Sequence, residues 1–409
     1  MRGVFALLAA TAVLAGCGGD ETSIPVVVSV PLSTEPWIAR SIEQGARLAV
    51  QDINERGDIR VGGKPATLRL EVLDHGGSPA NALANARQAV SSGAAVLLTD
   101  GTGAASVASV TDPASLPVFI CFEGGQDLID PRRWPTLFRM APPDAVLARR
   151  LADYVANSQP KVAMITDDSG YGEQGRAALR ESFAIDEVQV VSDQVISRRA
   201  QDIAPQLLAA RRAGATLLAL WTSAAGVAAV VEGVHEAGWD VPVIAGQTGE
   251  DPLVRQRLAA HPEWLSSLKF LSSRITAEIG PEPFERFREH FESEIGVENV
   301  GVKQNGRDVV QPPDWQMYPY DALALVEAAL RSTEALGAPL LKALNSVTVV
   351  GANGDSRGYS TDYHEGISPA DMYVARFDGF VFEAVKDDPL SGTLPAVPQL
   401  LSPDGSEPP

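Results

Sequence analysis

Three glycines near the middle of the chain have the spacing of a dinucleotide-binding loop. The stretch GYGEQG (170–175) follows the apolar run KVAMI (161–165) and precedes a helical pattern, which is where such a loop holds a pyrophosphate against a helix N-terminus. Asp167, Asp168 and Glu173 surround that point with negative charge, which opposes a phosphate ligand. We therefore expect this strand–turn–helix unit to contact another kind of solute, with an exported NAD-dependent enzyme as a distant alternative.

No other motif in the sequence indicates catalysis. The chain has no nucleophile elbow, no Walker loop, and no two of its five histidines at metal-ligand spacing. The stretch NGDSRG (353–358) lacks the alternating oxygen ligands and terminal Glu of a calcium loop, so it predicts a polar turn. Cys121 follows an apolar run without a basic neighbour and predicts a small buried side chain. We expect no catalytic residue, no metal and no cofactor, and hence a protein that is not an enzyme.

The N-terminus has the features of an export signal. One Arg and an apolar run precede LAGC (14–17), which resembles a bacterial lipobox, so residues 1–17 predict a signal peptide whose Cys17 receives a lipid anchor. A polar linker, residues 18–23, follows. With 33 basic and 52 acidic residues the formal net charge is −19, which excludes nucleic acid as a partner. We expect an exported protein, lipid-anchored at the outer face of the cell membrane or in the periplasm.

The elements that must position any site alternate between strand-like and helix-like runs. Most strand candidates are continuous apolar runs, as expected when helices cover both faces of a parallel sheet. These candidates are residues 24–30, 67–74, 94–100, 117–120, 161–168, 188–195, 215–222 and 241–247. The apolar stripe of one intervening helix consists of Ile42, Ala46, Ala49, Val50 and Ile53. The alternation restarts near residue 160, so we predict an α/β fold of two doubly wound lobes.

The last third of the chain has a different pattern. One helix is indicated by the apolar stripe Phe284, Phe287, Phe291 and Ile295. Residues 320–337 predict a helix that ends at Gly337, and residues 373–385 predict a hairpin that turns at Asp378-Gly379. Residues 387–409 are rich in Pro and acidic residues and predict a disordered tail.

Four segments carry a resemblance to a known family. They are EQGARLAVQDINERGDIRVGGKPATLRLEVLDHGGSPANALANARQAV (43–90), DDSGYGEQGRAALRESF (167–183), VVEGVHEAGWDVPVIAGQ (230–247) and YDALALVEAAL (320–330). In this order they resemble the type I periplasmic solute-binding proteins of ABC importers, in the branch that binds leucine, isoleucine and valine. The resemblance implies two Rossmann-like lobes joined by a three-crossover hinge, with the ligand at the carboxyl ends of the strands.

The expected crossovers lie near residues 143, 273 and 357. They give an N-terminal lobe of residues 24–142 and 274–356, and a C-terminal lobe of residues 143–273 and 357–386.

The resemblance implies ligand contacts from the N-terminal lobe. Thr102, with Gly103 beside it, matches the position whose hydroxyl binds the ligand carboxylate, and an ordinary helix cap is the alternative. The next loop, Glu123-Gly124-Gly125, lacks the hydroxyl that the family has at position 125, so a backbone amide would replace it or the contact would be lost. Trp37 falls where the first loop lines the pocket, and we expect it to stack on an apolar or aromatic ligand.

Further contacts are implied from the C-terminal lobe. Asp144 matches a pocket-adjacent Asp at the first crossover, with a helix cap as the alternative. Tyr171 matches an aromatic residue that covers the ligand. Ser223 lies where the family often has a Tyr, and Trp221 either replaces that aromatic residue or belongs to the core.

The sharpest departure from the family is at Gln247. The branched-chain amino acid binders usually have a Glu there that pairs with the ligand ammonium, so a neutral amide loses that charge pairing. Glu123 could restore the negative charge from the opposite lobe, and a solvated surface position is its alternative.

The resemblance implies a solute-binding lipoprotein that captures an amino acid or a related small carboxylate or amide and delivers it to an ABC permease. The ligand would shift the population from open to closed lobes, without any chemical step. A ligand-sensing receptor subunit that signals to a membrane partner is the alternative. Expected partners are the small-molecule ligand, the permease and the membrane through the lipid anchor, and we expect a monomer.

Overall fold

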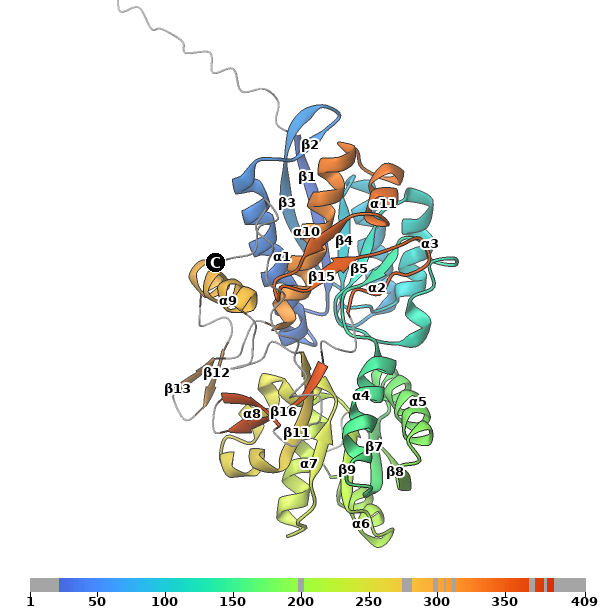
Figure 1. Cartoon of the computed structure of the whole chain (residues 1–409), viewed down its shortest axis with the longest axis vertical. Helices are drawn as coiled ribbons and strands as arrows, with labels where there is room; N and C mark the ends of the chain where they lie inside the picture. Colours follow the sequence, from blue (N-terminus) through green and yellow to red (C-terminus); the bar gives the residue numbers. More distant parts are fainter. Residues whose placement is uncertain are drawn as a thin grey trace, which may run out of the picture.

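The computed structural model describes residues 22–197, 202–273, 282–296, 301–304, 307–310, 314–367, 372–378 and 381–385. Within them the chain forms two lobes stacked along the long axis, each built on its own sheet (Figure 1). The expected signal peptide with Cys17, most of the linker and the tail of residues 387–409 lie outside the described residues. Among the helices that are described, none is long and apolar enough to cross a membrane.

The first lobe has a six-stranded sheet in the order β2-β3-β1-β4-β5-β6, which is parallel except for the edge strand β2. Its strands are β1 Thr22–Val30, β2 Arg60–Val61, β3 Lys64–Asp74, β4 Val96–Thr99, β5 Val118–Ile120 and β6 Leu137–Arg139. Three helices connect them: α1 Pro36–Arg56, α2 Pro79–Ser91 and α3 Ala104–Ala114. Strand β1 is central, because it pairs with both β3 and β4, and it is buried from Ile24 onward.

The second lobe has a seven-stranded sheet in the order β17-β16-β11-β10-β9-β7-β8. Its parallel strands are β7 Lys161–Asp167, β8 Gln189–Ile196, β9 Leu217–Trp221, β10 Val243–Ala245 and β11 Leu268–Ser273. The antiparallel edge consists of β16 Met372–Asp378 and β17 Val381–Ala384. Its helices are α4 Asp144–Ala156, α5 Gly170–Ile185, α6 Ala204–Arg212, α7 Ala224–Glu236 and α8 Pro252–Arg257. Short 3-10 turns lie at Gln247–Glu250 and Pro262–Ser267 in this lobe, and at Gln126–Leu128 in the first lobe.

After β11 the chain returns to cover the first lobe. The returning helices are α9 Glu282–Ile295, α10 Asp314–Thr333 and α11 Ala338–Leu344, and two small ribbons are formed by β12 Gly301–Gln304 with β13 Arg307–Val310 and by β14 Thr348–Val350 with β15 Ser356–Gly358. Helix α10 packs along α1, as Figure 1 shows in orange and blue. The aromatic stripe of α9 joins the same hydrophobic core as the apolar stripe of α1, so both predicted helices are confirmed.

The periodic pattern predicted the regular elements well. Each of the eight apolar runs contains a strand, and residues 373–385 form the β16–β17 hairpin, with its turn outside the described residues. The predicted helix end at Gly337 is wrong. Helix α10 begins earlier, at Asp314, and ends at Thr333, because Glu334 has a positive φ of 50° that stops the helix. Gly337 instead precedes α11.

The return to the second lobe lies later in the chain than the expected boundary at residue 357. Arg357 forms a buried ion pair with Asp321 of α10, at 3.2 Å between Nε and Oδ2. Tyr359 donates its hydroxyl to the carbonyl of Arg139 in β6, and Glu365 pairs with the Arg139 guanidinium. Residues 356–367 therefore pack on the first lobe, and the second sheet resumes at β16.

The contact between α1 and α10 generates a stability prediction at Gly45. A Cβ at this position would lie 2.0 Å from the backbone oxygen of Gln316 and 2.7 Å from Pro319 Cγ, so the helices would have to separate. We expect Gly45→Ala to lower the free energy of unfolding by about 2 kcal/mol or more, measured by urea denaturation. Gly170→Ala is the control, because nothing lies within 4 Å of a Cβ there, and its effect should stay within about 0.5 kcal/mol. Equal effects of the two changes would contradict this prediction.

Candidate functional site

The candidate site is formed by loops that follow the carboxyl ends of strands in both sheets. These loops are residues 100–103 and 121–125 in the first lobe, and residues 168–171, 222–223 and 246–250 in the second. Two of the contacts that join the lobes there involve side chains. The indole Nε1 of Trp315 donates to Glu250 Oε1 at 2.5 Å, and the backbone of Gly125 abuts the side chain of Gln174. The structure therefore has its two lobes closed over these loops.

A buried arginine fixes the 123–125 loop from behind. Arg139 Nη1 donates to the carbonyl of Gly125 at 2.7 Å, and the rest of its guanidinium forms a two-point ion pair with Glu365, at 2.7 Å from Nε and 2.5 Å from Nη2. A Cβ at Gly125 would lie only 1.8 Å from Gln174 Oε1. A side chain at this position would therefore require the end of the Gln174 side chain to move.

Asp144 is buried without any hydrogen-bond partner for its carboxylate. It is the first residue of α4 and only 1% exposed, and its backbone N–H donates to the carbonyl of Gly124 at 2.7 Å. Neither carboxylate oxygen has a partner, so the helix-cap alternative for Asp144 is wrong. Burial raises the pKa of Asp144 to about 7, against a smaller lowering by the charge of Arg139.

Glu123 is a second acid of this region. A Cβ at Gly101 would lie 2.6 Å from the Glu123 Cβ, so the Glu123 side chain lies against the backbone of the preceding loop. Burial, followed by the charges of Asp100 and Asp144, raises the pKa of Glu123 to about 8. Glu123 is therefore a half-buried acid rather than a fully solvated one, and two carboxyl groups of raised pKa lie near the junction of the lobes.

The Thr102 hydroxyl neither points to a free position for a ligand carboxylate nor caps helix α3. Its hydroxyl donates to Asp100 Oδ2 at 2.7 Å, which uses its one hydrogen, and its backbone N–H donates to Asp100 Oδ1 at 3.0 Å. Helix α3 is preceded by Gly103, which has a positive φ of 70°, and no side chain caps it. His75 also contacts Asp100, at 3.1 Å from Nε2 to Oδ1. Thr102 and Asp100 thus stabilise the loop itself.

The glycines of residues 170–175 serve the packing of the second lobe. Ser169 caps α5 by accepting from the N–H of Gly172 at 3.1 Å, and a Cβ at Gly172 would lie 2.1 Å from the carbonyl of Asp167. Gly175 lies against the ring of Trp221, because a Cβ there would be 2.0 Å from its Cδ1. Steric contact therefore accounts for the Gly172 and Gly175 positions of the dinucleotide-type spacing.

Asp167 links this turn to the next βα loop. It accepts from the hydroxyl and the N–H of Ser169, and its Oδ2 accepts from the N–H of Ser223 at 2.7 Å. Ser223 caps α7 by accepting from the N–H of Gly226. Ser223 therefore positions two elements of the second lobe.

Several polar atoms of the second lobe are buried without hydrogen-bond partners, and three of them lie at or next to the carboxyl ends of strands. They are the hydroxyl of Tyr171, the indole Nε1 of Trp221 and the amide Nε2 of Gln247. Tyr171 and Trp221 lie with ring centroids 5.8 Å apart, and a Cβ at Gly246, next to Gln247, would be 3.1 Å from the Tyr171 hydroxyl. Burial and the nearby charge of Asp144 raise the pKa of Tyr171. Unpartnered groups from this lobe thus gather beside the carboxyl groups described above.

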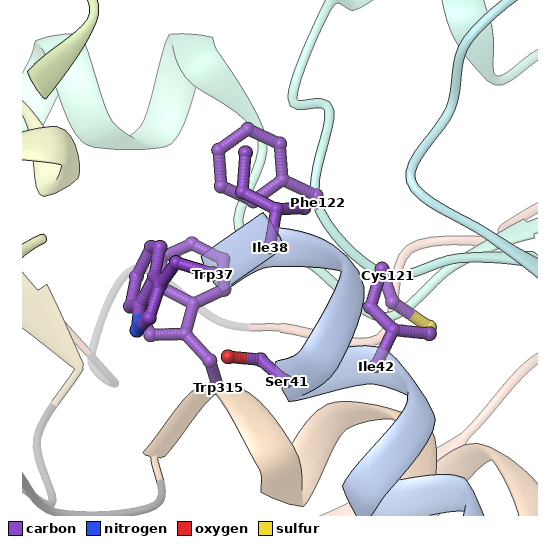
Figure 2. A pocket seen from close by; sticks show the side chains of 7 residues that line it. All are labelled: Trp37, Ile38, Ser41, Ile42, Cys121, Phe122 and Trp315. Atoms are coloured by element: carbon purple, nitrogen blue, oxygen red, sulfur yellow. The ribbon is translucent and has the colours of Figure 1, made fainter. Parts of the chain in front are cut away.

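An aromatic hollow lies at the first-lobe side of the contact between the lobes. Figure 2 shows the rings of Trp37, Trp315 and Phe122 around it, with Ser41 between the helices. Trp37 and Trp315 make an edge-to-face pair at 5.7 Å, and Phe122 lies 5.2 Å from Trp315. Trp37 is therefore part of an apolar wall next to the loop of Glu123.

The sequence interpretation missed two residues of this junction, Glu250 and Trp315. Glu250 is buried, and its Oε2 accepts from Ser272 at 2.7 Å while its Oε1 accepts from Trp315. An acid three residues after Gln247 and a Trp at the start of a long helix were visible in the sequence. Their pairing was not, because 65 residues separate them.

Comparison with known proteins places the chain among binding proteins. The profile of the periplasmic binding protein family matches residues 23–381. No curated protein has a significant sequence match to the chain.

Solved structures share the fold at low sequence identity. A type 1 periplasmic binding protein from Bordetella pertussis has a TM-score of 0.78 at 18% identity, covering 89% of this chain and 100% of its own. The branched-chain amino acid binding protein LivJ from Streptococcus pneumoniae, in complex with isoleucine, has 0.74 at 17%, covering 89% and 98%. A solute-binding protein of an ABC transporter from Rhodopseudomonas palustris, in complex with 3,4-dihydroxybenzoic acid, has 0.68 at 20%, covering 89% and 98%.

The hydrogen bond between Trp315 and Glu250 generates a prediction about closure. Trp315→Phe keeps an aromatic ring against Trp37 but removes the N–H that crosses between the lobes. Loss of this bond to a buried carboxyl group costs about 1–3 kcal/mol, so the ligand-free variant should be more open. Small-angle scattering should give a larger radius of gyration than for the wild type. Trp264→Phe is the control, since that ring stacks on His235 and His261 within the second lobe. Identical scattering of wild type and Trp315→Phe would contradict the prediction.

The raised pKa values of Glu123 and Asp144 generate a prediction about pH. Folding raises them from 4.5 to about 8 and from 3.8 to about 7, so between about pH 4 and pH 8 the folded state binds more protons than the unfolded state. The ligand-free protein should therefore lose stability as the pH rises through this window, with each of the two groups contributing at most about 1.4 kcal/mol for every pH unit. The double variant Glu123→Gln/Asp144→Asn should lose less over the same range in urea denaturation. Parallel pH curves for the two proteins would refute this assignment.

Proposed function

Because the chain belongs to the periplasmic binding protein family, we propose that it is an extracytoplasmic solute-binding protein of an ABC transporter. It binds one small organic solute between two closing lobes and presents the closed form to a permease. The ligand is an amino acid or a related small carboxylate or amide. The chain is exported, acts as a monomer and is anchored by lipid at Cys17.

One observation carries this proposal. Buried polar atoms without hydrogen-bond partners gather on the second-lobe side of the junction, namely the Asp144 carboxylate and the polar atoms of Tyr171, Trp221 and Gln247, and the Glu123–Gly125 loop of the first lobe lies against Asp144. A buried polar group without a hydrogen bond costs about 1–3 kcal/mol, so a protein rarely keeps several together unless a ligand satisfies them. A small solute with both hydrogen-bond donors and acceptors would do so.

Structures similar to this chain were solved with small organic solutes, which supports a ligand of that kind. The relatives named above were solved with isoleucine and with 3,4-dihydroxybenzoic acid, and a substrate-binding protein from Desulfitobacterium hafniense was solved with leucine. The mechanism is a population shift, because the ligand adds contacts to both lobes only in the closed form. The described residues contain no cluster of His, Cys, Asp or Glu that could hold a metal ion, and the mechanism uses none.

A thermal-shift screen tests the proposal. Amino acids, small amides and aromatic acids are added singly to the purified protein, with NAD as the comparison. A true ligand at roughly a hundred times its Kd should add about 2.7 kcal/mol to the free energy of unfolding and raise the thermal midpoint. The same compound should reduce the radius of gyration in small-angle scattering. Stabilisation by NAD, with none by any small solute, would overturn the proposal in favour of an enzyme.

A further inference from the structure

We propose that the cleft recognises its solute through a protonated amine, and that Asp144 and Glu123, rather than the residue at Gln247, provide the negative charge that holds it. This inference rests on the proposed function and specifies the ligand class. The solute would be an amine or an amino acid, and an acid without an amino group would be rejected.

The first support is the environment of Asp144. Its carboxylate is buried against the backbone of Gly124, because a Cβ there would lie 2.3 Å from Asp144 Oδ1. Both oxygens lack partners although the residue opens a helix, where an acid commonly caps. A buried carboxylate that neither caps nor pairs is costly, so a cationic group from outside the chain is the partner that would offset its burial.

The second support is the absence of a protein cation for this pair. Within the described part of the chain, neither Glu123 nor Asp144 forms a salt bridge. Arg139 is the nearby guanidinium, but its nitrogens bond to Glu365 and to the carbonyl of Gly125. Asp100 is also engaged, by Thr102 and His75. Asp144 and Glu123, which lie where the lobes meet, are therefore without a basic side-chain partner in the described structure.

The third support is the number of acceptors. An ammonium has three N–H donors, and the site offers the carboxylates of Asp144 and Glu123 and the hydroxyl oxygen of Tyr171. The Tyr171 hydroxyl lies beside the Gln247 loop, because a Cβ at Gly246 would be 3.1 Å from it, and burial followed by the charge of Asp144 raises its pKa. These groups come from both lobes, so an amine among them would bind only when the lobes are closed.

The unpaired atom of Gln247 fits a different part of the solute. Its Nε2 is the atom without a partner, and an amide N–H₂ donates to a carbonyl or carboxylate oxygen rather than to an ammonium. The unpaired Nε1 of Trp221 is also a donor. The site therefore offers donors, from Gln247 and Trp221, as well as acceptors, from the acid pair, to a molecule that carries an amine at one end.

Matched probes test the proposal by titration calorimetry at neutral pH. The probes are L-leucine, 4-methylpentanoic acid and isopentylamine, with L-phenylalanine, 3-phenylpropanoic acid and 2-phenylethylamine. We expect at least one amine-bearing probe to bind at least about tenfold more tightly than the acid that lacks the amino group, because charge-assisted hydrogen bonds to the acids are lost. Asp144→Asn and Glu123→Gln should each weaken binding of that probe by about tenfold or more.

Two controls separate a binding role from a structural one. Asp168→Asn removes an exposed acid near Tyr171 and should change the affinity less than about twofold, which controls for net charge. Asp144→Asn should keep or raise the thermal midpoint of the ligand-free protein, since it removes an unpaired buried charge. A lower midpoint would indicate that Asp144 is needed for folding instead.

The outcomes distinguish this inference from the proposed function. Binding of either acid without its amino group as tightly as its amine-bearing counterpart, or an Asp144→Asn affinity within about twofold of the wild type, overturns the amine assignment while solute binding stands. If none of the six probes binds but an amide or aromatic acid without an amine does, the amine assignment also fails. If no small solute binds at all, the proposed function itself fails.

Discussion

Two acids at the junction of the lobes, the buried Asp144 and the half-buried Glu123, are the constraint on which the rest of the site depends. Both acids are shielded from solvent in this structure, Asp144 more completely than Glu123, and no basic side chain that is described pairs with them. Burial raises the pKa of both groups because the charged form is no longer solvated. The closed form therefore carries a cost when the cleft is empty, and a ligand that compensates this charge would shift the population towards closure.

The hydrogen bond between Trp315 and Glu250 favours the closed form, whereas the buried acids oppose it. It joins α10 of the first lobe to the loop after β10, and Ser272 satisfies the second oxygen of the same carboxyl group. The aromatic contacts of Trp315 with Trp37 and Phe122 add apolar area to this junction. A small free-energy difference between these favourable contacts and the buried acids would let a ligand of modest affinity control closure, because a change of about 1.4 kcal/mol alters the population ratio by about tenfold.

Regular elements could be predicted from the sequence because their cause is local. Continuous apolar runs gave the strands, and the stripe of α1 gave a helix, since both periodicities depend only on neighbouring residues. Side-chain roles at the site could not be predicted in the same way. Thr102 matched a carboxylate-binding position, yet Asp100, two residues away, accepts its hydroxyl hydrogen. Asp144 matched a cap position, yet its oxygens lack partners and lie against the backbone of Gly124 in the other lobe. Such roles depend on which distant segments meet.

The glycines of residues 170–175 show that the same glycine spacing can serve packing instead of phosphate binding. In a dinucleotide site the glycines let the backbone approach a pyrophosphate, whereas here Gly172 and Gly175 admit Asp167 and the ring of Trp221. The same spacing follows because a strand–turn–helix unit brings the same positions close to the sheet in either case. The surrounding acids, which oppose a phosphate, suit a cationic solute, and the formal charge of −19 over the whole chain would also attract a cation towards the cleft. The glycine spacing of this turn therefore serves packing and carries no preference for a phosphate ligand.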